Sequence, residues 1–229
     1  MSLFSLSGRR ALVTGAGGGL GQAIVTALHG AGAEVLTSGD LPADLSDPAQ
    51  VAALALAAGP VDVLVCNAGM EGPVGPLARA GDLEPLFQVN LLAALELCNA
   101  LIPGMAARGG GSVVLMSSIA ALRGNRAIGA YALTKAALAQ LARNLAVEWG
   151  PSQVRVNAVA PGLIRTPLAA GLMADPAFMA RRLAATPLRR VGEADEVAGV
   201  VLMLASRAGG FITGQTLVVD GGTLISDGS

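Results

Sequence analysis

Two side chains in the second half of the chain have the types and spacing needed for proton transfer to an alcohol. Tyr131 is the only tyrosine, and Lys135 follows it four positions later. Residues four apart lie on one face of a helix, so this spacing places a phenol beside an ammonium group. A free phenol has a pKa of about 10, and a neighbouring positive charge lowers that value. Such a phenol can act as a general acid or base towards an alcohol oxygen.

A hydroxyl group completes the candidate set. Ser118 precedes Tyr131 by thirteen residues and follows the apolar run Ser112–Ser117, which predicts a strand that ends at the site. A serine hydroxyl there can hydrogen-bond a substrate oxygen on which negative charge develops. A tyrosine four residues before a lysine is by itself common on solvated helices. The pattern therefore indicates catalysis only together with the elements that position it.

Short apolar runs alternate with longer stretches rich in alanine and leucine, which indicates strands alternating with helices. The expected strands are Ala11–Thr14, Glu34–Thr37, Val61–Cys66, Ser112–Ser117, Val154–Ala158 and Thr216–Val219. The expected helices are Leu20–Gly30, Pro48–Ala58, Asp82–Ala107, Ala130–Trp149 and Ala194–Ser206. Strands that are apolar throughout are buried on both faces, so we predict an α/β fold with a doubly wound parallel sheet. We find no linker or repeat, so residues 1–229 are expected to form a single domain.

The first strand leads into TGAGGGLG, Thr14–Gly21, which opens the first helix. Glycines let the backbone approach a pyrophosphate, and the helix N-terminus offers free N–H groups. The spacing fits glycines at Gly15, Gly19 and Gly21, and it does not fit G-x-G-x-x-G, which would require a glycine at Leu20. A packing turn without a ligand is the alternative interpretation.

Further motifs follow in a fixed order, and together they resemble those of the short-chain dehydrogenase/reductase family over nearly the whole chain. TGAGGGLG is similar to the family's TGxxxGxG loop, CNAG at Cys66–Gly69 to its NNAG motif, and Asn90 in FQVNLL to its catalytic asparagine. The remaining matches are the triad Ser118, Tyr131 and Lys135 and the segments RVNAVAPGLIRT, Arg155–Thr166, and ITGQTLVVDGG, Ile212–Gly222. Cys66 stands where the family usually has its first asparagine. This departure should affect backbone packing more than the chemistry of the site.

The resemblance implies a Rossmann-type fold and hydride transfer between a nicotinamide cofactor and a secondary alcohol or ketone. Tyr131 would be the general acid or base, and Lys135 would lower its pKa and bind the nicotinamide ribose. Ser118 would hold the substrate oxygen, and Asn90 would hold a water that links Lys135 to solvent. The implied cofactor contacts are Gly15, Gly19, Leu20, Gly21, Asn67, Ala68, Gly69, Tyr131, Lys135, Pro161, Gly162, Ile164 and Thr166.

The segment SGDLPADLSD, Ser38–Asp47, should decide how the adenosine half of the cofactor is bound. An acid is expected about 20 positions after the glycine loop, and Asp40 lies 19 after Gly21. A carboxylate there binds the 2′- and 3′-hydroxyls and repels a 2′-phosphate, so we expect NAD. The family's acid usually stands where Gly39 would align, one position before Asp40, so NADP is kept as the less favoured alternative. Asp44 and Leu45 resemble the family's adenine-binding pair.

Three residues separate Asp40 from Asp44, although a crossover between parallel strands needs about a dozen. We therefore predict that the second crossover helix, between Ser38 and Asp47, is shortened or missing. The third strand would then be a stub or absent, and the adenine side of the site would be open.

Residues 161–192 form the longest irregular segment, with a short helix expected around Pro176–Ala185, and should act as a substrate lid. Leu168, Leu172, Met173 and Phe178 would suit a hydrophobic or medium-sized ketone or alcohol, although packing against the body is an equal interpretation. The basic residues Arg165, Arg181, Arg182, Arg189 and Arg190 would suit an acidic carrier or a solvated face. An NADPH-dependent 3-oxoacyl-thioester reductase is thus an alternative. A non-catalytic dinucleotide sensor is disfavoured because the triad is present.

Composition restricts the partners and the compartment. A net charge of −1 argues against a nucleic-acid partner. We expect no metal site, because Cys66 and Cys98 do not have the spacing of metal ligands. Despite a mean hydropathy of +0.61, no apolar run reaches the roughly 18 residues of a membrane span, and we expect no signal peptide. Two reduced thiols indicate the cytoplasm. Small residues along Ala130–Trp149 favour a homotetramer, with a dimer possible.

Overall fold

A six-stranded parallel sheet forms the centre of the molecule in the described residues, 2–37, 40–72 and 80–226, of the computed structural model. The strand order is β2-β1-β3-β4-β5-β6. The strands are β1 Arg10–Val13, β2 Glu34–Thr37, β3 Val63–Cys66, β4 Gly111–Met116, β5 Val154–Pro161 and β6 Thr216–Val219. The helices are α1 Gly19–Gly30, α2 Pro48–Ala58, α3 Ala80–Phe87, α4 Ala93–Ala107, α5 Gly129–Trp149, α6 Ala170–Met173, α7 Pro176–Ala184 and α8 Ala194–Ala205.

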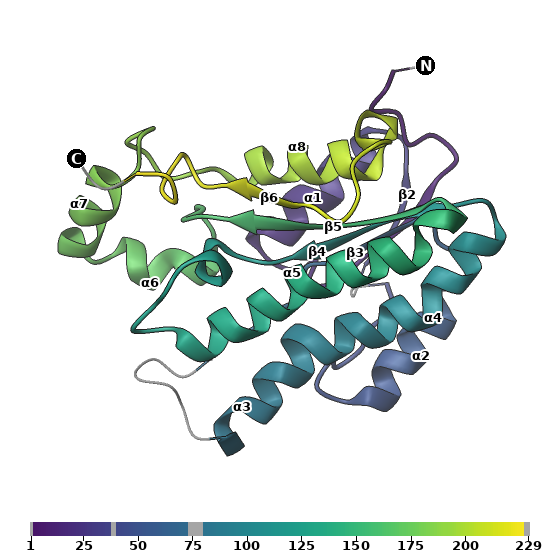
Figure 1. Cartoon of the computed structure of the whole chain (residues 1–229), viewed down its shortest axis with the longest axis horizontal. Coiled ribbons are helices and arrows are strands. Elements are labelled where there is room, and N and C mark those ends of the chain that lie inside the picture. Colours follow the sequence, from purple (N-terminus) through teal and green to yellow (C-terminus); the bar gives the residue numbers. More distant parts are fainter. Residues whose placement is uncertain (1, 38–39, 73–79, 227–229) are drawn as a thin grey trace.

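Helices cover both faces of the sheet, as the apolar strands predict. Figure 1 shows α1 and α8 on one face and α2, α4 and α5 on the other. Alternate residues of each strand enter the two cores, so Leu12 and Leu64 face α2 and α4, whereas Val13 and Val65 face α1 and α8. All four are fully buried. The predicted doubly wound α/β architecture is confirmed.

The second crossover helix is missing, as the short spacing between Asp40 and Asp44 predicts. Residues 40–47 contain neither helix nor strand; Ser38 and Gly39 lie outside the described residues. Asp47 then caps α2, because its side chain accepts a hydrogen bond from Ala49 N. One helix thus carries the chain from β2, across β1, to β3. Within the described part of the chain no strand lies outside β2, which forms the edge of the sheet.

The expected helix Asp82–Ala107 is interrupted in the structure. After α3 the chain forms one π-helical segment, Gln88–Leu92, before it continues as α4. A π segment adds a residue to a turn, and such segments frequently occur at functional sites. Here it contains Asn90, which is buried. The helical periodicity of the sequence gave no signal for this change.

The run Leu83–Ala107 is, by length and apolar composition only, the one helix among the described residues that would be long enough to cross a membrane. Its buried side chains, among them Leu97 and Ile102, belong to the core beneath the sheet. Packing against the sheet therefore accounts for its apolar character.

Candidate active site

The glycine loop after β1 is joined to the end of β3 by hydrogen bonds. The hydroxyl of Thr14 accepts from the backbone N–H groups of Asn67 and Ala68, both at 3.1 Å. The Asn67 side-chain amide donates to the carbonyls of Thr14 and Gly15, at 3.1 and 3.0 Å. Two motifs that lie more than fifty residues apart in the sequence are thereby held as one unit.

Close backbone approaches explain the glycines of this loop. A Cβ atom on Gly21 would lie 2.1 Å from the carbonyl oxygen of Gly15, and one on Gly15, where φ is +65°, would lie 2.7 Å from Ala68 Cα. A Cβ on Gly19 would lie 2.8 Å from Pro167. These three glycines therefore allow the loop to pack closely against its neighbours. Gly17 and Gly18, where a Cβ would meet no atom within 4 Å, leave bare backbone open to a pyrophosphate.

A cavity of about 270 Å³ lies beside this loop and collects the residues predicted to bind adenine. Asp44 and Leu45 form one side, Ala68 and Gly69 another, and Gly15 lines it as well. The remaining lining residues are Leu12, Val13, Thr14, Ala43, Leu54 and Val89. Three segments that are separate in the sequence thus converge on one apolar hollow at the carboxyl ends of β1 and β3.

Asp40 does not line this cavity. Its carboxylate accepts hydrogen bonds from the backbone N–H and the hydroxyl of Thr37, at 2.9 and 2.7 Å. These bonds lower the pKa of Asp40, so the side chain is ionised at neutral pH. A fixed negative charge consequently stands just after the end of β2, and its contact with a ribose stays a prediction.

Lys135 is the only lysine of the chain and is buried. Its ammonium group donates to the carbonyl of Met116, at the end of β4, over 2.8 Å. Burial lowers the pKa of Lys135 to about 8, and the nearby Cys66 acts weakly in the opposite direction. The ammonium nitrogen also lies 5.5 Å from the centre of the Tyr131 ring and 3.1 Å from where a Cβ on Gly69 would stand.

Ser118 and Glu71 both act on the ionisation of Tyr131. Burial is the largest influence and raises the pKa of Tyr131; the side-chain hydrogen bond with Ser118 lowers it, and the charge of Glu71 raises it. The net shift is upward, which differs from the lowering that the sequence led us to expect from Lys135. The physical reason is that desolvation of the phenolate outweighs the favourable contacts around it.

Asn90 is bonded to backbone in this structure. Its side-chain oxygen accepts from Met70 N at 2.8 Å, and its amide nitrogen donates to Met70 O at 3.0 Å and to the Thr134 hydroxyl at 3.2 Å. The π segment thus directs Asn90 onto the chain that follows the CNAG motif. Asn90 orders the wall of the site beside Gly69, and its role in holding a water stays a prediction.

The end of β5 closes the opposite side of the loop. Thr166 contacts the glycine loop, since its Cβ lies 3.0 Å from where a Cβ on Gly19 would stand. Ile164 pairs with Gly192 in an isolated bridge, which fixes the start of the lid. Gly162 lies against Asp220, and Pro161 pairs with Val219. Of these four residues, the structure places Thr166 against the glycine loop, and it places Ile164, Gly162 and Pro161 against other segments.

The predicted lid contains α6 and α7, and its apolar residues Leu168 and Leu172 are exposed, at 58% and 48%. These two side chains are thus largely open to solvent, and their role as pocket walls stays a prediction. Of its arginines, Arg165 pairs with Glu193 at 3.0 Å and Arg190 with Glu196 at 2.5 Å. Arg189 donates to carbonyls near the end of α7. Within the described part of the chain, Arg181 and Arg182 alone of these five arginines form neither an ion pair nor a side-chain hydrogen bond, and Arg182 lies over the Phe178 ring; this weakens the interpretation as a carrier-binding surface.

Two charged residues near the site were missed by sequence reasoning. Glu71 follows the CNAG motif by two positions, and its negative charge raises the pKa of Tyr131. Arg123 ends the short 3₁₀ turn that Ser118 begins, and its positive charge lowers the pKa of Arg182 in the lid. Their positions directly after two recognised motifs were the signal that was available, but the sequence does not show where the chain turns.

Comparisons with known proteins agree with this geometry. The family profile described as enoyl-(acyl carrier protein) reductase matches residues 37–223. Dehydrogenase/reductase SDR family member 4 of Bos taurus is 42% identical over 168 residues, which cover 72% of this chain and 60% of that protein. L-xylulose reductase of Bos taurus is 38% identical, covering 96% of this chain and 98% of that protein.

Among solved structures, a putative NAD(P)-dependent gluconate 5-dehydrogenase from Beutenbergia cavernae, with NADP bound at low occupancy, superposes with a TM-score of 0.93. It is 38% identical and covers 98% of this chain and all of that chain. The glycine loop and the residues Ser118, Tyr131 and Lys135 agree with these matches. The matches establish that the chain belongs to the short-chain dehydrogenase/reductase family and is an oxidoreductase of the alcohol dehydrogenase type.

Proposed function

We propose that the protein transfers a hydride between NAD(H) and a secondary alcohol or ketone, with Tyr131 as the general acid or base. The observation that carries this proposal is the position of the phenol, which lies between the Ser118 hydroxyl and the buried Lys135 ammonium at the carboxyl edge of the sheet. The names of the relatives, a xylulose reductase and a gluconate dehydrogenase, support a polar, hydroxylated substrate.

The residues present fit a nicotinamide dinucleotide, because a Cβ on Gly17 or Gly18, at the N-terminus of α1, would meet no protein atom within 4 Å, so a pyrophosphate can approach the backbone there. When bound, the cofactor supplies or receives the hydride. The chain's own residues handle the proton and the orientation. Ser118 holds the reacting oxygen, and Tyr131 takes its proton when an alcohol is oxidised or donates one when a ketone is reduced. Lys135, held by the Met116 carbonyl, stabilises the phenolate that forms.

The preference for NAD over NADP is supported by charge at the end of β2. Asp40 is ionised there, and the sequence contains no lysine or arginine between Thr14 and Asp44 to neutralise a 2′-phosphate. The second candidate is an NADPH-dependent 3-oxoacyl-thioester reductase. The description of the matching family profile and the NADP bound to the Beutenbergia cavernae protein favour that candidate.

Two further proposals concern the setting of the enzyme. Cys66 and Cys98 are free and buried, which supports a reducing compartment such as the cytoplasm. Exposed apolar side chains on α5, Leu133 and Val147, support assembly into a homotetramer or dimer through that helix.

Replacing Tyr131 with Phe should abolish turnover and leave dinucleotide binding largely intact, because only the hydroxyl that moves the proton is lost. Steady-state rates with NAD and a panel of secondary alcohols, together with NADH binding by fluorescence, measure both effects. Tyr131→Phe with close to full activity would refute the mechanism.

Replacing Lys135 with Met should stabilise the fold at pH 7 while it removes activity. The pKa of Lys135 is about 8 in the folded state and 10.5 when unfolded, so below pH 8 the buried charge costs on the order of 3 kcal/mol. Between pH 8 and 10.5 the unfolded state holds the extra proton, so the stability of the native sequence rises and the gap to the variant shrinks. Urea unfolding across this range measures the gap. A variant that is less stable at pH 7, with a gap independent of pH, would contradict this prediction.

Replacing Asp40 with Ala should invert the preference between NADH and NADPH, because the charge that repels a 2′-phosphate is removed. Titrations of both dinucleotides by fluorescence give the two dissociation constants. Glu34→Gln, at the exposed start of the same strand, is the matched control and should leave the preference unchanged. Tighter binding of NADPH by the unmodified protein would instead move the acyl-thioester reductase to first place.

A further inference from the structure

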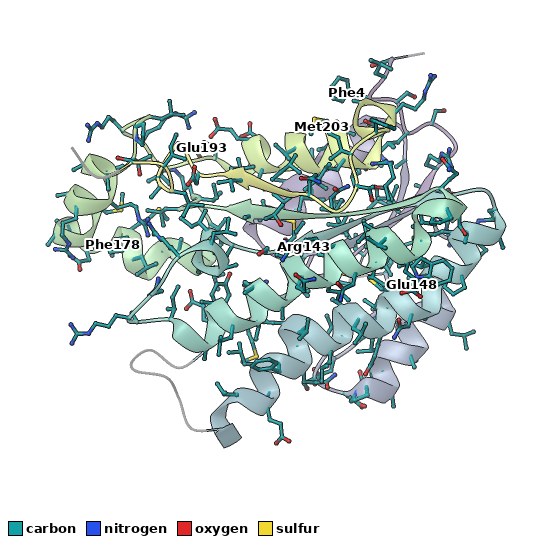
Figure 2. All side chains as sticks on the ribbon, viewed as in Figure 1. Phe4, Arg143, Glu148, Phe178, Glu193 and Met203 are labelled. Atoms are coloured by element: carbon teal, nitrogen blue, oxygen red, sulfur yellow. The ribbon has the colours of Figure 1, made fainter. Side chains whose placement is uncertain are left out.

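A second cavity lies at the opposite edge of the sheet from the candidate active site. It has a volume of about 250 Å³ and reaches the amino ends of β3 and β4, at Val63 and Gly111. Figure 1 shows this end of the molecule on the right, where the N-terminus and the end of α8 lie, and the lid helices α6 and α7 on the left. In Figure 2, Phe4 marks the same end and Phe178 the lid. No residue lines both this cavity and the one beside the glycine loop.

Four arginines line this second cavity, and they come from four segments of the chain. Arg9 precedes β1, Arg108 ends α4, Arg155 lies on β5 and Arg207 follows α8. Asp62 is the one acidic side chain among the described lining residues, so the lining has a formal charge of +3. The chain as a whole has a net charge of −1. Such a local concentration of positive charge favours an anionic ligand.

Two of the four guanidinium groups are held in place by backbone carbonyls. Arg155 donates to the carbonyls of Leu204 and Gly209, at 2.7 and 2.8 Å, and Arg108 donates to the carbonyl of Val61 at 2.5 Å. These bonds fix both side chains, but a carbonyl is neutral and leaves the positive charge unbalanced. A guanidinium group has five N–H donors, and in the described part of the chain the Nε–H groups of Arg108 and Arg155 have no acceptor. The two residues thus form a fixed, positively charged wall.

The other two arginines are weakly engaged. Arg207 is exposed, and among the residues that the structure describes its side chain forms neither a hydrogen bond nor an ion pair. Arg9 pairs with Asp62 over 3.4 Å, and its side chain is 57% exposed, so this ion pair contributes little to stability. The second carboxylate oxygen of Asp62 accepts from the backbone N–H of Arg10 at 3.0 Å. Contacts within the protein therefore explain why Arg108 and Arg155 stand here, and leave Arg9 and Arg207 unexplained.

Neutral groups at the second cavity also have donors that the protein does not use. The Ser5 hydroxyl accepts from Ser7 N at 3.3 Å, and its own proton meets no acceptor in the described ranges. The side-chain amide of Gln153, on the turn before β5, forms no hydrogen bond with any described residue. Gly109 leaves its backbone open, since a Cβ there would meet no atom within 4 Å. The lining thus offers many N–H and O–H donors beside a single carboxylate, which is the balance that an oxyanion requires.

The number of donors and the size of the second cavity favour a phosphate group over a carboxylate or a dinucleotide. A carboxylate is planar and carries one charge, whereas a phosphate group carries nearly two and presents several oxygens in different directions. Donors that arrive from four segments therefore suit phosphate. The volume of about 250 Å³ is below the roughly 300–1,000 Å³ of pockets for drug-sized ligands, so a small ion or ester fits better than a dinucleotide.

We propose that the second cavity binds a phosphate dianion, either free or as the phosphate group of a small ester, between Arg9 and Arg207 and against the wall of Arg108 and Arg155. The site goes beyond the proposed function and does not depend on it, because the two cavities lie at opposite edges of the sheet and share no residue. A bound dianion joins the segments before β1, after α4 and after α8. Phosphate should therefore stabilise the folded protein in proportion to its affinity.

Calorimetry tests the site with inorganic phosphate, titrated into the whole protein at constant ionic strength, with and without saturating NADH. With NADH present the protein should still bind one phosphate per chain. Arg9→Gln and Arg207→Gln should each weaken this binding about 10-fold, since each removes a charge-assisted contact. Arg143→Gln, exposed on α5 and bonded to Gln140, is the matched control and should bind phosphate as the native sequence does.

Two results of this titration would overturn the proposal: phosphate binding that NADH abolishes, or binding that neither cavity variant weakens. If the protein binds no dinucleotide, the proposed function fails, and the two variants alone decide the phosphate site. Tighter binding of malonate than of phosphate would refute the choice of a phosphate group. Glycerol phosphate that binds as tightly as inorganic phosphate would assign the site to esters, and binding of inorganic phosphate alone would assign it to the free ion; both results support the site.

Hydrogen exchange locates the bound phosphate independently of any variant. Phosphate should slow the exchange of backbone amides in residues 107–111 and 206–210, which follow α4 and α8 and line the cavity. Residues 14–21 of the glycine loop should exchange at an unchanged rate. Protection of the glycine loop alone would place the phosphate at the cofactor site and contradict the proposal.

Discussion

The site depends on how α5 is fixed to the end of β4. The buried Lys135 ammonium donates to the carbonyl of Met116, and the hydroxyl of Ser117 donates to the backbone carbonyl of Lys135, at 2.8 and 2.7 Å. These two bonds fix the turn of α5 that carries Tyr131 against the strand that delivers Ser118. A charge buried in this way is unfavourable for folding, and it persists because the surrounding sheet and helices leave it no other position. The buried charge of Lys135 thus lowers the folding stability at the candidate active site.

The missing crossover helix changes the edge of the sheet and leaves the centre as it is. Because α2 follows almost directly after Asp44, β2 has no outer neighbour in the described residues, and the cavity lined by Asp44 and Leu45 is bounded there by a short loop. The proposed catalytic residues come from the end of β4, from α5 and from the π segment, which lie on the other side of β1. The chain can therefore lose this crossover without disturbing the groups that carry out the reaction.

Much of the fold was predictable from the sequence, because parallel strands and the helices that cover them leave strong local patterns. The apolar runs predicted all six strands with every boundary within three residues, and the spacing of Asp40 and Asp44 predicted the missing helix from a length argument alone. What the sequence did not give depends on contacts between distant segments. The π turn at Asn90, the bonds that hold Asp40 to Thr37, and the approach of Arg123 to Arg182 arise only once the chain is folded. The upward shift of the pKa of Tyr131 likewise follows from burial, which a four-residue spacing cannot show.

The most direct test of this account is the ionisation of Tyr131 itself. The chain has one tyrosine and one lysine, so carbon-13 labelling of the tyrosine ring gives a single resonance that can be followed with pH by NMR, with and without NAD. The account predicts a pKa above the ordinary value of about 10 for the protein alone, and a downward shift when the positively charged nicotinamide binds beside the phenol. An ordinary pKa that NAD does not change would mean that Tyr131 is a solvated side chain, and would contradict the assignment of this residue as the proton carrier.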